Sequence, residues 1–92
     1  MATFVYIFLS VDQAPYRSAH GTMIITAKNK YGAQARVGVG ALMSGGKRAL
    51  DDCGLEMLED YAFSNKGTDS AIAMHFTNDN AFFIAKLRLQ GG

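Results

Sequence analysis

The chain has 92 residues, of which 49% are hydrophobic and 18% are charged, and nine Lys and Arg against eight Asp and Glu give a formal net charge of +1. This composition predicts one globular domain, residues 1–92, and excludes a disordered chain. Cys53 is the single cysteine, so an intrachain disulfide is excluded and we expect a reducing, cytoplasmic location. The apolar run at residues 4–9 is too short to cross a bilayer.

The charges are unevenly distributed along the chain. Five of the eight acidic residues lie within residues 51–60, and the remaining residues carry nine Lys and Arg against three Asp and Glu, a formal +6. Such a separation gives a small domain two electrostatic faces. It suits docking on charged partners better than action on a small-molecule substrate.

The N-terminal half contains three segments for which we predict β-strands. Residues 3–11 carry β-branched and aromatic residues at both odd-numbered and even-numbered positions, which is typical of a strand covered on both faces. A polar loop follows, and residues 22–28 alternate weakly as a second strand. Residues 33–42 also alternate, but Gly38 and Gly40 weaken this third strand, and a helix is the alternative.

An amphipathic helix is predicted after Ser44-Gly45-Gly46, which we expect to separate it from the preceding strand. Its apolar residues recur at three- and four-residue spacing from Leu50 to Tyr61. The turn-forming residues 65–67 favour a helix end there.

Two further strands are predicted at residues 71–77 and 81–89. Asn78-Asp79-Asn80 between them is typical of a hairpin turn. The predicted order β-β-β-α-β-β implies an α+β fold, an antiparallel sheet of about five strands with one amphipathic helix packed on one face.

This fold predicts a cationic surface. If the apolar residues of each strand pack under the helix, the cations of the strands share the opposite, open face of the sheet. Such a face fits phosphates or an acidic protein surface, although open sheet faces also carry Lys and Arg for solubility and against edge pairing. With the neighbouring turn and the helix start, the candidate partner-binding residues are Lys28, Lys30, Arg36, Lys47, Arg48, Lys86 and Arg88.

The predicted helix carries a second candidate surface. Its acidic residues lie mostly opposite the apolar stripe, and Asp52, Glu56, Glu59 and Asp60 form a secondary acidic face. A solvated helix face explains this pattern, and the alternative is a row of carboxylates that imitates phosphates for a basic groove on another protein.

No catalytic, metal or cofactor site is predicted. A Walker A phosphate loop needs Gly where Ala41 stands and Ser or Thr where Arg48 stands. Cys53, His20 and His75 are too few and too scattered for a zinc site. We therefore predict that the protein is not an enzyme.

Three segments carry a resemblance to a known class of proteins: Phe4-Val5-Tyr6-Ile7-Phe8-Leu9, Lys28-Asn29-Lys30-Tyr31-Gly32 and Phe82-Phe83-Ile84-Ala85-Lys86. With its size, charge separation and general character, the chain resembles the anti-CRISPR proteins that inhibit type I-F RNA-guided surveillance complexes. The resemblance implies a phage-encoded, stoichiometric, non-enzymatic inhibitor in the cytoplasm of the infected host bacterium. It implies Cas proteins as partners, leaves a contact with guide RNA open, and implies a block of target DNA recognition or hybridisation. These inhibitors share no motif, so no residue role is transferred.

Two other functions remain open from the sequence. One is a small phage regulator that binds nucleic acid directly. The other is a structural protein that assembles through residues 22–28 as an apolar edge strand. The sequence does not decide which charged face docks, which Cas subunit is bound, or the oligomeric state.

Overall fold

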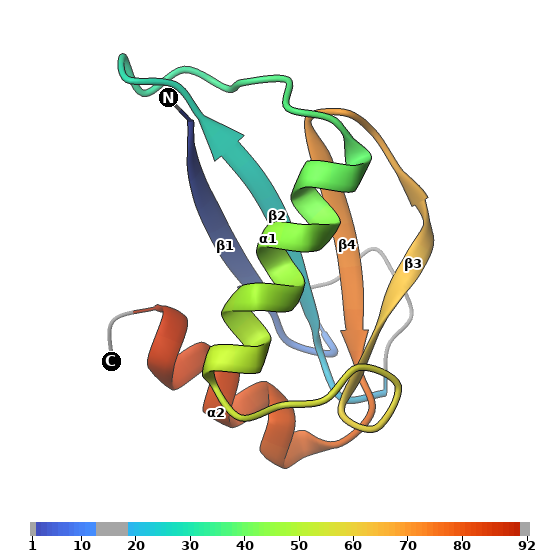
Figure 1. The fold of residues 1–92 in the computed structure, drawn as a ribbon. Coiled ribbons are helices and arrows are strands. Elements are labelled where there is room, and N and C mark those ends of the chain that lie inside the picture. The colour runs from blue at the N-terminus through green and yellow to red at the C-terminus, as the bar shows by residue number, and fades with distance from the viewer. Residues whose placement is uncertain (1, 13–18, 91–92) are drawn as a thin grey trace.

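The described part of the chain folds into one antiparallel sheet with two helices (Figure 1). The computed structural model describes residues 2–12 and 19–90, with the backbone alone for residues 65 and 66. Its elements in chain order are β1 (Thr3–Leu9), β2 (Thr22–Lys28), α1 (Val39–Asp52), β3 (Tyr61–Gly67), β4 (Ala71–Phe76) and α2 (Asp79–Leu89). The α+β prediction with an antiparallel sheet is confirmed, although the sheet has four strands and the described chain has two helices.

The strands lie in the order β1-β2-β4-β3, so β1 and β3 form the two edges of the sheet. β1 pairs with β2 over all seven residues without a break in register, whereas the β3–β4 register shifts between Phe63 and Gly67. Because β2 lies between β1 and β4, residues 22–28 are not an edge, and the predicted assembly through them is wrong.

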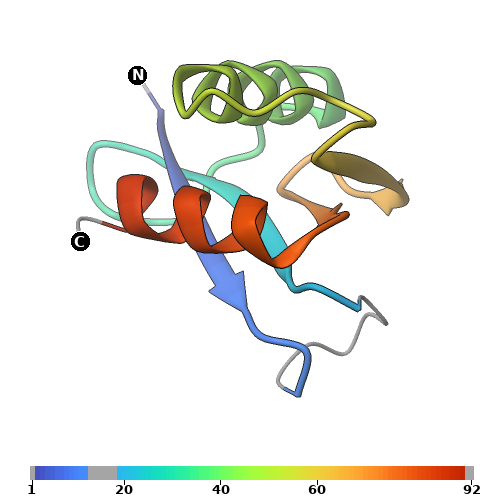
Figure 2. The ribbon, with the colours of Figure 1, turned by 90° about the horizontal axis from the view of Figure 1, so that it is seen from below.

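The core lies between the sheet and the helices. Alternate residues of β2, namely Met23, Ile25 and Ala27, are fully buried on the side that faces α1. α1 runs over β2 and β4, while α2 crosses the ends of the strands at the opposite end from the residue 29–32 turn (Figures 1 and 2). Phe82 of α2 packs edge-on against Phe8 and Phe76, with ring centroids 6.0 and 5.6 Å away.

Two glycines bring α1 close to the sheet. Gly45 faces the ring of Phe4 and Gly46 faces Ile25, and a Cβ atom on either glycine would overlap with that neighbour. Leu42 and Leu50, each four residues from Gly46, complete the buried stripe of the helix. The helix interior therefore uses its glycines for packing.

The end of α1 is a Schellman motif. The amide of Gly54 donates to the carbonyl of Asp51, and the amide of Leu55 donates to the carbonyl of Leu50. Gly54 has φ of +83°, a left-handed conformation that glycine adopts at low cost. Leu55 is buried, as expected for the apolar contact that accompanies this motif.

Two predictions for the middle of the chain are wrong. Residues 33–42 are not a strand, since they form a loop with one β-bridge at Gln34 and then the first turn of α1. The helix predicted after residues 44–46, with its end at residues 65–67, ends at Asp52 instead, and residues 61–67 form β3. The first error comes from treating Gly45 and Gly46 as a break, when their missing side chains allow the helix to approach the sheet. The second comes from including Gly54 in the helix, when its left-handed conformation ends α1.

The predicted strand at residues 81–89 is also wrong, because this segment is helix α2. The side chain of Asn78 caps the helix by accepting a hydrogen bond of 2.7 Å from the amide of Ala81. Ala81 and Ala85 are buried four residues apart, which is helical spacing. Asn favours both turns and helix starts, so the hairpin interpretation and the helix share one sequence signal.

The close approach of α1 predicts opposite effects for two glycines of the same helix. Gly46→Ala should lower the free energy of unfolding by about 1–2 kcal/mol, because overlap with Ile25 outweighs the gain in helix propensity. Gly40→Ala, with open space around its Cβ position, should raise it by about 0.5–1 kcal/mol. Urea denaturation of both variants measures the difference, and stabilisation by both would contradict the packing described.

Tyr61 predicts a stabilising substitution. Its side chain is fully buried, and its hydroxyl has no hydrogen-bond partner among the described residues. Removing this hydroxyl in Tyr61→Phe should raise the free energy of unfolding by about 1 kcal/mol at neutral pH. Burial, reinforced by Asp51 and Asp60, raises the pKa of Tyr61 from 10.0 to about 12. The wild type should therefore lose stability as the pH rises above 10, and the variant should lose less. Denaturation across the alkaline range tests this, and a less stable variant at neutral pH would contradict it.

Candidate functional site

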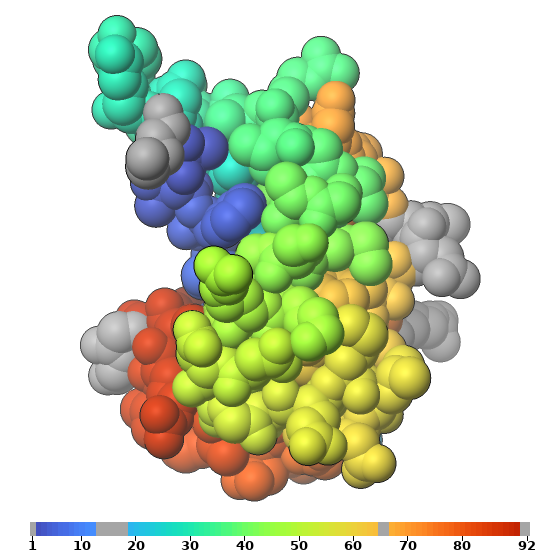
Figure 3. Space-filling model, viewed as in Figure 1, coloured from blue at the N-terminus to red at the C-terminus, as the bar shows by residue number. Residues whose placement is uncertain are grey.

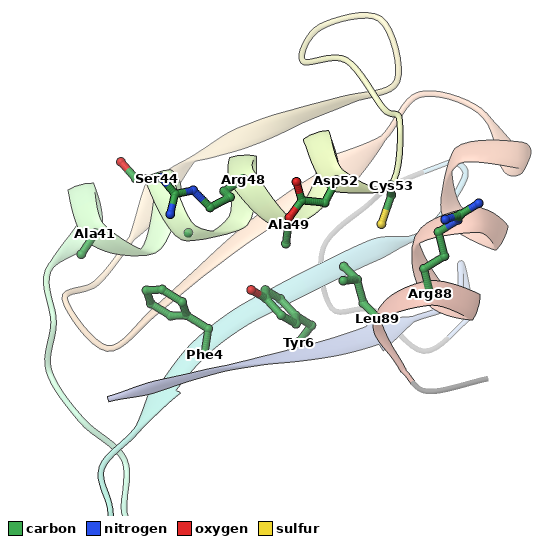
Figure 4. A pocket seen from close by; sticks show the side chains of 11 residues that line it. Phe4, Tyr6, Ala41, Ser44, Arg48, Ala49, Asp52, Cys53, Arg88 and Leu89 are labelled. Atoms are coloured by element: carbon green, nitrogen blue, oxygen red, sulfur yellow. The ribbon is translucent and has the colours of Figure 1, made fainter. Parts of the chain in front are cut away.

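A groove of about 860 Å³ runs between the edge strand β1, helix α1 and the C-terminal end of α2 (Figure 4). The space-filling view shows the molecule hollowed beside β1 (Figure 3). Its lining residues are Phe4, Tyr6, Ala41, Ser44, Gly45, Arg48, Ala49, Asp52, Cys53, Arg88 and Leu89.

Aromatic rings form the floor of the groove. Phe4 and Tyr6 alternate along β1, so both side chains rise on the side of the sheet that carries α1 (Figure 4). Because α1 runs over β2 and β4, these two rings remain only half-buried. The floor therefore presents apolar, planar surface beside an open strand edge.

Charged side chains stand along the walls. Arg48 and Asp52 lie one turn apart on α1, and Arg88 lies near the end of α2 (Figure 4). Arg48 and Arg88 are exposed, and neither forms an ion pair within residues 2–12 and 19–90. Two guanidinium groups beside one carboxylate leave the groove with a positive charge available to a partner.

Two other predicted cations are already paired within the chain. Arg36 forms an ion pair of 2.7 Å with Asp69, and Lys47 forms one of 2.9 Å with Asp51. The Arg36 guanidinium lowers the pKa of the Asp69 carboxyl. These pairs leave Arg36 and Lys47 less available than Arg48 for an external anion.

The groove also raises the pKa values of two groups. Burial, the nearby Asp52 carboxylate and Cys53 raise the pKa of Tyr6. Burial raises the pKa of the Cys53 thiol, while Arg88 opposes the increase and Asp52 reinforces it. The thiol is therefore held in its protonated, weakly nucleophilic form near neutral pH.

The predicted cationic sheet face is wrong. Lys28 lies at the end of β2 and Lys30 at the following turn, while Arg36 lies in the loop before α1. Lys86 and Arg88 are on α2, at the opposite end of the molecule from that turn (Figures 1 and 3). The predicted strands at residues 33–42 and 81–89 do not supply this surface, because the first is a loop with the start of α1 and the second is part of helix α2.

The groove nevertheless brings together three of the candidate residues, Arg48, Arg88 and Asp52. Lys86 lies outside it, with its Nζ atom 5.9 Å from the ring centroid of Phe82. Lys30 lies with its Nζ atom 5.1 Å from the ring centroid of Tyr31 at the distant turn.

The predicted acidic helix face is wrong as well. Glu56, Glu59 and Asp60 lie in the loop between α1 and β3. The Asp60 carboxylate accepts hydrogen bonds from the Glu56 amide at 2.9 Å and the Asn78 side chain at 3.2 Å. Asp60 therefore holds this loop against the start of α2.

Phe4 and Tyr6 are groove residues that the sequence analysis did not assign to a site. Their alternation with Phe8 was the available signal, since it places three aromatic rings on one face of a strand. Phe8 is buried against Phe82, whereas Phe4, which packs against Gly45 of α1, and Tyr6 are only partly buried.

Comparisons with known proteins give no match: no protein-family model, no curated protein and no solved structure is similar to this chain. Among the described residues, no group of three or more His, Cys, Asp or Glu is placed to hold a metal ion. No helix in the described parts of the chain is long and apolar enough to cross a membrane.

Cys53 provides a chemical test of the groove's electrostatics. Asp52→Asn should lower the thiol pKa and speed alkylation by iodoacetamide, because it removes a negative neighbour. Arg88→Gln should raise the pKa and slow alkylation. Alkylation rates measured against pH give both pKa values. Shifts in the same direction for both variants would contradict the described geometry.

Proposed function

We propose that this protein is a non-enzymatic inhibitor that binds a type I-F RNA-guided surveillance complex and blocks recognition or hybridisation of target DNA. Its partners are Cas proteins of that complex, with the groove between β1, α1 and α2 as the docking surface. The proposal joins the resemblance of the sequence to the geometry of the groove.

The proposal is carried by two arginines, Arg48 and Arg88, that lie in one groove with an aromatic floor and form no ion pair with any residue that the structure describes. Arginine is enriched at protein interfaces and presents a planar fork of donors that fits carboxylates and phosphates. Aromatic side chains supply the apolar contact that interfaces need. A nucleoprotein complex offers both kinds of anion.

The chemistry of the groove favours binding over catalysis. Its one thiol, Cys53, has a raised pKa, and its described lining includes no histidine that would act as a base for it. A single carboxylate, Asp52, does not provide the pair that acid–base hydrolysis uses.

A second candidate function is direct binding of nucleic acid as a small phage regulator. The half-buried rings of Phe4 and Tyr6 favour it, because bases stack on aromatic side chains while arginines hold the phosphates. A gel-shift assay with free RNA and DNA at moderate salt separates the two functions, since a regulator binds unaided and an inhibitor requires the protein complex.

Removing the two groove arginines tests the docking surface. The double variant Arg48→Gln, Arg88→Gln should weaken binding to a purified type I-F surveillance complex by about tenfold or more, because charge-assisted hydrogen bonds are lost. Biolayer interferometry gives the affinity, and a target-DNA binding assay of the same complex gives the inhibition.

The matched control is Lys28→Gln, Lys30→Gln, which removes the same charge at the distant turn. It should retain affinity within a few-fold, apart from a general effect of net charge that salt screens. A larger loss in this control than in the groove variant would reject the groove as the docking surface. Absence of binding by the wild type to the complex would reject the inhibitor function itself.

A further inference from the structure

We infer that the outer edge of β1 and the adjoining groove form a binding site for an extended acidic polypeptide segment, which adds to the sheet as a fifth strand. This inference deepens the proposed docking function by stating the chemistry of the partner segment. It rests on that function for the biological partner, while the site itself is argued from the edge and groove alone.

The outer edge of β1 carries backbone groups that can pair with another strand. Alternate residues of an edge strand direct their amide and carbonyl groups away from the sheet, ready to pair with another strand. Within the described residues, no backbone hydrogen bond reaches the outer edge of β1. Thr3–Leu9 also lacks the charged residues, proline and bulge that usually protect such an edge.

The opposite edge of the sheet provides a contrast within the same molecule. β3 has a register shift between Phe63 and Gly67, which breaks the regular row of hydrogen-bonding groups. β1 keeps its register with β2 over its full seven residues. The two edges therefore differ, and the regular one lies beside the groove.

Two guanidinium groups, those of Arg48 and Arg88, lie in the groove beside this edge. A strand added to β1 would place every second side chain on the groove side, next to Phe4 and Tyr6. Arg48 lies over the Phe4 end of the floor, and Arg88 lies beyond Leu89 toward the other end (Figure 4). Carboxylates on groove-facing positions near the two ends of the added strand would meet these guanidinium groups.

The position of Asp52 predicts which side chain the bound segment carries in its middle. Its carboxylate lies on the α1 wall between the positions of the two arginines (Figure 4). A third carboxylate at the middle groove-facing position would be repelled, whereas a hydroxyl there would hydrogen-bond to Asp52. The preferred segment therefore alternates acidic, hydroxyl and acidic side chains on one face.

The same observations disfavour two other occupants. A second copy of the chain pairing through β1 would bring no carboxylate on that strand, because Thr3–Leu9 has none, so the arginines would stay unpaired. A single-stranded RNA would engage the arginines and rings, but it lacks the peptide groups that complete a β-ladder. An acidic extended segment satisfies both the edge and the arginines.

The test uses a fluorescent seven-residue probe, acetyl-Val-Glu-Val-Thr-Val-Glu-Val-amide, matched to the length of β1. Fluorescence anisotropy should show binding that the Arg48→Gln, Arg88→Gln variant weakens by about tenfold. The Lys28→Gln, Lys30→Gln variant should bind within a few-fold of wild type. A probe with Gln in place of both Glu should bind as weakly as the groove variant does.

Methylation of probe amides tests the ladder without altering the protein. N-methyl groups on the residues of one parity should abolish binding, and those on the other parity should leave it, because only one side of the probe faces β1. Bound probe should also slow alkylation of Cys53, which lines the groove. Equal effects at both parities, or no protection of Cys53, would overturn the inference.

Two competing outcomes would also overturn it. Light scattering that shows a stable dimer unable to take up the probe would assign the edge to a second copy. Displacement of the probe by a short single-stranded RNA that binds more tightly through the same arginines would assign the groove to nucleic acid.

Loss of probe binding in a variant that still inhibits the surveillance complex would reject the edge-strand mode and leave the proposed function standing. Probe binding by a protein that never binds the complex would reject the function and leave the site.

Discussion

The close contact between α1 and the sheet determines where the molecule has a usable surface. Gly45 and Gly46 allow the helix to lie against Phe4 and Ile25, at a distance that a side chain on either glycine would prevent. A helix held this close packs mainly on β2 and β4 and leaves the outer strand β1 with half-buried rings. Gly45 itself lines the groove, so the packing that builds the core also forms one wall of the candidate site.

This packing determines which charged side chains are available to a partner. The net charge of the chain is near zero, and several charged residues interact within the chain: Arg36 with Asp69, Lys47 with Asp51, and Asp60 with the Glu56 amide and the Asn78 side chain. Arg48 differs from its neighbour Lys47 because α1 turns it toward the groove (Figure 4). A small surface with two available guanidinium groups, and not the overall charge separation, is what the structure offers to an anionic partner.

Part of this arrangement was predictable from sequence. Residues 22–28 alternate and were predicted as the strand that is β2, residues 71–77 were predicted as the strand that is β4, and the α+β class followed from the predicted order of strands and helix. The helix α1 was not recognised in the sequence because glycine has a low helix propensity. The position of Gly46 inside this helix is explained by its close contact with Ile25, which the sequence does not show. The apolar residues of 81–89 fit both the two-residue period of a strand and the 3.6-residue period of a helix. The cap that Asn78 provides to the amide of Ala81 favours the helix. Arg48 and Arg88 were candidates for a wrong reason, because their shared groove depends on two helices that the sequence did not reveal together.

We propose the β1 edge and its groove as the surface through which this protein binds its partner. The decisive measurement is hydrogen–deuterium exchange of the protein, free and bound to a type I-F surveillance complex. Exchange should be slower in the complex for the amides of Thr3–Leu9 and of α1 around Arg48, with little change at the turn of residues 29–32. Protection centred on that turn, with β1 exchanging as in the free protein, would contradict it.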